Sequence, residues 1–149
     1  DAAPPADVEA LQQALIDELT AADVLLVGAP LYNYTVPSTL KSWLDYVHVP
    51  GVTVPFDEPT QPMTGRPAVV VTSQGVAYDP GTPTEGQDHA VPVLQILLGQ
   101  ALGMELTVVT VPLGLAATVP ALADQRERAD SEFAAAHETL AALATKLAG

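Results

Sequence analysis

The sequence predicts a single α/β domain built around a parallel sheet. Three short apolar runs have the composition of buried strands, at residues 23–29, 67–73 and 105–111. Segments with helical periodicity separate these runs, and this strict alternation is typical of α/β folds. A chain of 149 residues, 48% of them hydrophobic, can form one domain with a substantial core.

The first predicted helix covers residues 8–21. Its apolar residues repeat at helical spacing, at Val8, Leu11, Leu15 and Leu19. Asp7 stands directly before it, so we expect this side chain to be the N-cap. The continuous apolar run that follows is typical of a parallel strand covered on both faces.

The second predicted helix has Pro37 in its first turn, where the missing N–H of proline costs nothing. Its apolar residues form one stripe, at Leu40, Trp43, Leu44 and Val47. Residues 48–66 are rich in Pro and Gly, which predicts a long surface loop that can contain a short hairpin.

Two further helices follow the second and third strands. The first covers residues 90–102, with Pro92 in its first turn and one apolar face at Val91, Leu94, Leu98 and Ala101. The second runs from Pro120 to Ala148. The residues expected to face inward are Leu122, Ala129, Phe133, Ala136, Leu140, Leu143 and Leu147.

Charge and composition exclude several functions. Five basic residues against 18 acidic residues give a net charge of -13, which repels nucleic acids and anionic membranes. The absence of cysteine suits a cytoplasmic protein. There is no signal-peptide pattern and no apolar run near the roughly 20 residues of a membrane helix. We therefore expect a soluble protein that does not bind nucleic acid.

Candidate ligand-binding residues follow the first two strands, because open α/β sheets bind ligands beyond the carboxyl ends of their strands. Tyr32-Asn33-Tyr34 offers aromatic faces and backbone amides, which suit a planar, hydrogen-bonding ring. Ser73-Gln74-Gly75 offers a second wall, where Gly75 permits close backbone approach. Spacing alone supports equally well the alternative that these tyrosines pack against neighbouring loops.

A metal site is not expected, and neither is a glycine-rich phosphate loop. The three histidines, His48, His89 and His137, lie far apart without the paired spacing of metal ligands. Neither the P-loop pattern nor G-x-G-x-x-G occurs in the sequence.

A series of motifs makes the sequence resemble a known family. The series is Ala29-Pro30-Leu31-Tyr32-Asn33-Tyr34, then Leu40-Lys41-Ser42-Trp43-Leu44-Asp45, then Gly51-Val52-Thr53. Thr64-Gly65-Arg66 precedes the second strand, and Ser73-Gln74-Gly75 follows it. Together these segments resemble the FMN-dependent NADH:quinone oxidoreductases, the azoreductase family, which implies a flavodoxin-like three-layer sandwich.

The resemblance extends from about residue 7 to the end of the chain. Members of that family begin with a strand, a serine-containing phosphate-binding loop, a helix and a second strand. This sequence shows no counterpart of these elements. We therefore expect an N-terminal strand–helix–strand unit, and the phosphate half of the flavin site, to be missing from the chain.

The resemblance also implies which residues bind FMN. One side of the flavin ring would be lined by Pro30, Leu31, Tyr32, Asn33 and Tyr34. The pyrimidine side would be held by Ser73, Gln74, Gly75 and Val76, with Tyr78 near the flavin O2. Val76 replaces the family's second glycine, and Gln74 stands where arginine is common. A substrate-pocket wall, completed across a homodimer interface, would include Phe56, Leu97 and Gln100.

The function implied by the resemblance is hydride transfer from NADH or NADPH, through FMN, to a quinone or an azo compound. The flavin N5 carries that chemistry, so no catalytic side chain is expected. Two alternatives stay open: a flavodoxin-type electron carrier without a nicotinamide site, and a flavin-free interaction domain.

Overall fold

The computed structural model describes residues 6–149 and confirms the predicted α/β fold. Three parallel strands lie in the order β1-β2-β3, at Leu25–Gly28, Pro67–Ser73 and Glu105–Val111. The α-helices are α1 (Ala6–Ala21), α2 (Ser38–Val47), α3 (Ala90–Leu94) and α4 (Arg126–Leu147). A π-helical segment, η1 (Gln95–Ala101), continues α3, and a 3₁₀ segment, η2 (Pro120–Gln125), precedes α4.

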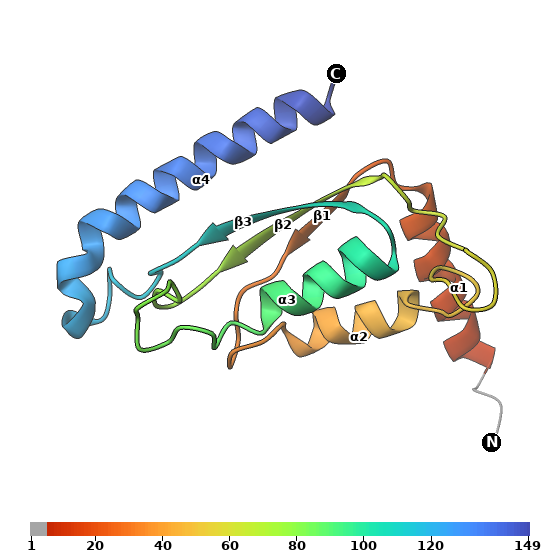
Figure 1. Cartoon of the computed structure of the whole chain (residues 1–149), viewed down its shortest axis with the longest axis horizontal. Coiled ribbons are helices and arrows are strands. Elements are labelled where there is room, and N and C mark those ends of the chain that lie inside the picture. Colours follow the sequence, from red (N-terminus) through yellow and green to blue (C-terminus); the bar gives the residue numbers. More distant parts are fainter. Residues whose placement is uncertain (1–5) are drawn as a thin grey trace.

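The elements form three layers, with the sheet as the middle layer. Figure 1 shows α2 and α3 along one face of the sheet and α4 across the other, with α1 beside α2. Every strand points toward the same edge, so the loops that follow the three strands gather there. This carboxyl edge is where a ligand is expected in an open α/β sheet.

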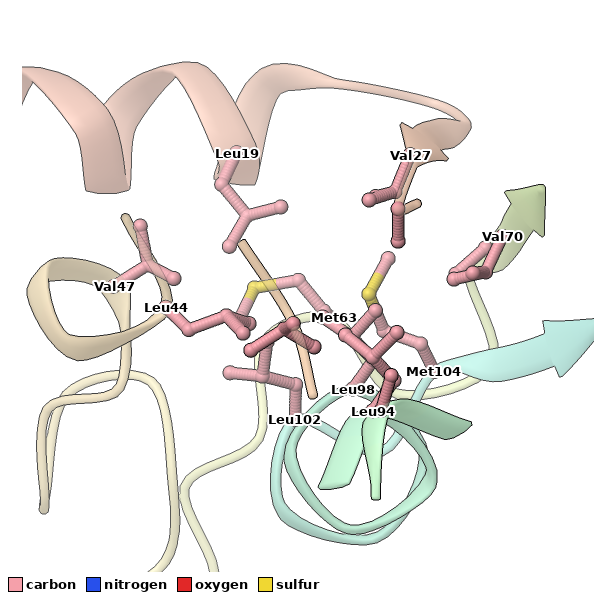
Figure 2. Packing of buried hydrophobic residues seen from close by; sticks show 14 of the residues in the cluster. Leu19, Val27, Leu44, Val47, Met63, Val70, Leu94, Leu98, Leu102 and Met104 are labelled. Atoms are coloured by element: carbon pink, nitrogen blue, oxygen red, sulfur yellow. The ribbon is translucent and has the colours of Figure 1, made fainter. Parts of the chain in front are cut away.

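The core lies between the sheet and the layer formed by α2, α3 and η1. Its most deeply buried side chains come from several elements and pack together in Figure 2, with Leu44, Met63, Leu94, Leu98 and Leu102 at the centre. The predicted stripes of α2 and of residues 90–102 both contribute to it. No helix within residues 6–149 is long and apolar enough to cross a membrane.

The first strand is less covered than its apolar run predicted. Val27 is buried against the core, but Leu26, on the opposite face, is 71% exposed. Among residues 6–149, α4 is the only helix on that face, and a cavity of about 490 Å³ separates β1 and β2 from the C-terminal half of α4. The prediction of a strand covered on both faces is therefore wrong for one face.

Several local predictions also need correction. Asp7 lies within the first turn of α1, which begins at Ala6, and is not its N-cap. Leu11 is exposed, and Ile16 takes the inward position beside Leu19. Pro37 is the N-cap residue of α2 and so stands just before its first turn.

Two longer segments differ from expectation as well. The segment 48–66 contains an isolated parallel bridge between Pro50 and Val54 instead of a hairpin. Phe133, predicted to face inward, is exposed, whereas Ala136 on the next turn of α4 is buried. The phenyl ring of Phe133 lies instead at a cavity between α4 and the loop after β3.

Candidate functional site

The loops that follow the three strands are joined by backbone hydrogen bonds at the carboxyl edge. The N–H of Leu31 donates to the carbonyl of Ser73 at 2.8 Å. The N–H of Gln74 donates to Val111 at 2.9 Å, and the carbonyl of Gln74 accepts from Gly114 at 2.9 Å. These bonds continue the sheet's ladder beyond the strands and give the loops a fixed relative position.

The segment Tyr32–Thr35 forms a tight two-residue turn. The N–H of Tyr32 donates to the carbonyl of Thr35 at 3.0 Å, and the reverse bond is 3.1 Å long. Its central residues have positive φ angles, 48° at Asn33 and 70° at Tyr34, as a type I′ turn requires. Asparagine tolerates this conformation, but tyrosine pays roughly 1–2 kcal/mol for it.

The strained turn holds aromatic surface in solvent. The side chains of Tyr32 and Tyr34 are 61% and 52% exposed, and Asn33 between them is exposed too. Backbone strain of this kind persists where the surrounding structure supports it, and it concentrates at functional sites. Pro30 and Leu31, which lead into the turn, are half-buried, and Leu31 packs against the core.

The second loop supplies a mostly buried wall. Ser73 is exposed, but the side chain of Gln74 is buried, and Val76 and Tyr78 are half-buried. A Cβ atom at Gly75 would lie 2.9 Å from Cδ1 of Leu115, so glycine lets the loop after β3 pack closely here. Tyr32 and Asn33 line a cavity of about 500 Å³, whereas Val76 lines a separate one of about 220 Å³.

Some backbone donors in these two loops lack a protein acceptor. The N–H groups of Asn33, Tyr34, Gly75 and Val76 donate to no protein acceptor within residues 6–149. A planar heterocycle with ring nitrogens and carbonyl oxygens would supply acceptors for such donors.

The phenol of Tyr78 stays protonated at physiological pH. Burial is the main reason that the pKa of Tyr78 is raised above its ordinary value, and the negative forms of nearby Tyr34 and Asp88 raise it further. The hydroxyl of Tyr78 can therefore donate a hydrogen bond to a ligand.

Sequence reasoning missed the role of Asp88. This side chain accepts a hydrogen bond from Nε2 of Gln74 at 2.7 Å and also caps the start of α3. Its neighbour His89 donates its backbone N–H to the carbonyl of Tyr34 at 2.9 Å. The only available signal was an aspartate just before a predicted helix, which indicates a cap but not the contact with Gln74.

Residues 1–141 match a protein family described as having a flavodoxin-like fold. The chain belongs to this family. The FMN-dependent NADH:quinone oxidoreductase of Kineococcus radiotolerans is 58% identical over 133 residues, which are 89% of this chain and 62% of that protein. The protein of the same name from Streptomyces avermitilis is 42% identical over 137 residues, 92% of this chain and 62% of that protein.

Solved structures show the same fold at lower identity. An azoreductase from Bacillus anthracis aligns with a TM-score of 0.75 and 21% identity, over 92% of this flavodoxin-like chain and 62% of the azoreductase. An FMN-dependent NADH-azoreductase from the same species, in complex with FMN, aligns with a TM-score of 0.73 and 18% identity. This alignment covers 93% of this chain and 64% of the azoreductase chain. The chain thus spans less than two thirds of the length of these four proteins.

Three predicted pocket residues of this flavodoxin-like chain do not join the loops at the carboxyl edge. Phe56 is exposed and lies in the segment from the end of α2 to the start of β2, at the opposite edge of the sheet. Leu97 packs partly against the core. Gln100 lies near the end of η1, where its carbonyl accepts from Nε2 of Gln61 at 3.0 Å.

Proposed function

We propose that this chain binds the ring system of FMN at the carboxyl edge of its sheet. In this role the chain is the flavin-binding part of an oxidoreductase. The enzyme passes hydride from NADH or NADPH, through the flavin, to a quinone or an azo compound. The observation that carries the proposal is that the neighbouring loops after β1 and β2 hold two exposed tyrosines and four N–H groups with no acceptor within residues 6–149. The names of the relatives at 58% and 42% identity support the same activity.

The residues at this edge fit a flavin ring in shape and in polarity. The ring is flat and apolar on its faces, which suits Tyr32 and Tyr34. Its edge carries carbonyl oxygens and nitrogens, which suit the free N–H groups and the Tyr78 hydroxyl. The proposed contact residues are Pro30, Leu31, Tyr32, Asn33, Tyr34, Ser73, Gln74, Gly75, Val76 and Tyr78.

Bound FMN would supply the chemistry by accepting a hydride and passing two electrons on. The chain's own contribution is binding, orientation and electrostatics. Fixed N–H donors stabilise negative charge that develops on a ligand oxygen, because they need no reorganisation. The tyrosine side chains would exclude water from the faces of the flavin ring that they cover. Neither role requires an acidic or basic side chain.

We further propose that the protein forms a homodimer. In it, Phe56, Leu97 and Gln100 of one chain would form a wall of the substrate pocket of the other. Within one chain these residues lie away from the tyrosine turn, so they could serve a flavin only through a second copy. The exposed phenyl ring of Phe56 is available for such a contact. We also propose a cytoplasmic location, where NADH and NADPH are available.

Anaerobic addition of NADH to the FMN-loaded protein tests the proposed function. The long-wavelength absorbance of bound flavin is expected to bleach, and a quinone added afterwards should restore it. NADPH is compared in parallel, and free FMN at equal concentration is the control. A flavin that stays bound but is not bleached by either nucleotide would support the electron carrier instead. A protein that takes up no FMN would support the flavin-free interaction domain.

A further inference from the structure

The carboxylate of Asp88 joins three separate parts of the candidate site. Oδ1 accepts from the N–H groups of Ala90 and Val91, at 2.8 and 3.1 Å, and so caps the start of α3. Oδ2 accepts from Nε2 of Gln74 at 2.7 Å. The backbone N–H of the following residue, His89, donates to the carbonyl of the strained Tyr34.

Gln74 is held in a single conformation. Its backbone is fixed on both sides, because its N–H donates to Val111 and its carbonyl accepts from Gly114. Its side chain is only 6% exposed, so protein atoms rather than solvent surround the amide. The contact with Asp88 then determines whether the NH₂ group or the oxygen of the Gln74 amide faces Asp88.

A carboxylate only accepts hydrogen bonds, so Gln74 must turn its NH₂ group toward Asp88. The side-chain oxygen of Gln74, Oε1, accepts from no protein donor within residues 6–149 and is not fully occluded. Within residues 6–149, this loop therefore offers one unused acceptor on the Gln74 side chain and two unused N–H donors on the next two residues, Gly75 and Val76. This pattern complements the pyrimidine edge of a flavin, which has one N–H donor between two carbonyl oxygens.

We infer that Asp88 is a positioning residue for flavin recognition, which acts by fixing the orientation of the Gln74 amide. This inference rests on the proposed function, because it assigns the presented oxygen to the ring. Asp88 itself need not touch the flavin. It sets which hydrogen-bonding group Gln74 presents.

The substitution Asp88→Asn tests this orientation. Asparagine keeps an oxygen to cap α3, but it turns an NH₂ group toward Gln74, so the amide of Gln74 must reverse. The affinity for FMN, measured by quenching of flavin fluorescence, is expected to fall roughly fivefold, the equivalent of one hydrogen bond. The matched control is Glu85→Gln in the same loop, because within residues 6–149 the Glu85 carboxylate accepts a hydrogen bond only from the N–H of Gly81. This control should bind FMN as wild type does.

A double-substitution cycle separates positioning from a plain loss of charge. In a Gln74→Met background, where no amide remains to be oriented, Asp88→Asn should leave FMN affinity unchanged. If Asp88→Asn weakens binding as much in that background as in wild type, Asp88 does not act through Gln74 and the inference is overturned.

A measurement without flavin keeps this test independent of the proposed function. In NMR spectra of the flavin-free protein, the side-chain NH₂ signals of Gln74 should shift in Asp88→Asn and keep their positions in Glu85→Gln. Unchanged Gln74 signals in Asp88→Asn would also overturn the inference. If wild-type protein takes up no FMN while these signals still shift, the proposed function fails, and with it the role of the amide in flavin recognition. The Asp88–Gln74 contact itself would still be established.

Discussion

Replacing Leu98 with alanine is expected to lower the free energy of unfolding by about 3–5 kcal/mol. Leu98 has no exposed surface and lies in the core cluster with Leu94 and Met63. Truncation there removes buried methyl groups and leaves a cavity that the neighbouring side chains fill only in part. Urea-induced unfolding, followed by circular dichroism, measures the loss.

The matched control is Ile96→Ala in the same π-helical segment. Ile96 is about half exposed, so its truncation should cost less than about 1 kcal/mol. Similar losses for the two variants would show that η1 does not pack onto the sheet as described.

Replacing Tyr34 with glycine is expected to stabilise the protein and to weaken flavin binding. Glycine adopts the positive φ of 70° without strain, and Asn-Gly is the favoured pair for a type I′ turn. After allowance for the greater flexibility of glycine in the unfolded chain, the net gain is about 0.5–1 kcal/mol. Loss of the aromatic ring should lower FMN affinity about tenfold, a typical worth of one aromatic contact.

Opposite changes in stability and affinity distinguish functional strain from ordinary packing. Tyr34→Phe is the control, because it keeps both the ring and the strain and should match wild type in both measurements. Thermal unfolding and fluorescence titration with FMN give the two values. Undiminished FMN affinity in Tyr34→Gly would remove Tyr34 from the proposed site. A loss of stability would show that the side chain packs against the loops.

The sequence predicted the strands well where apolar residues run without interruption. The second and third strands begin and end at the predicted residues, because each is a continuous β-rich run. The first strand is shorter than predicted and open on one face, because its cover depends on what packs beside it and not on its own composition. The prediction that Phe133 faces inward was also wrong. Helical periodicity indicates which residues share a face of α4, but not how closely that face approaches the sheet.

The location of the candidate site was predicted better than its construction. The order of strands and loops is enough to bring Tyr32–Tyr34 and Ser73–Gly75 to one edge. The left-handed conformation of Tyr34 could not be foreseen, because tyrosine is unfavourable there and tertiary contacts impose it. The bond between Gln74 and Asp88 joins two loops whose relative position no local pattern encodes.

An NMR titration of the protein with FMN tests the proposed flavin site. The backbone amide signals of Asn33, Tyr34, Gly75 and Val76 are expected to shift together and saturate, because these N–H groups gain acceptors. Amide signals at the opposite edge of the sheet, such as that of Met63, should stay in place. Flavin binding that leaves all four signals unmoved would contradict the account and place the ring elsewhere on the chain.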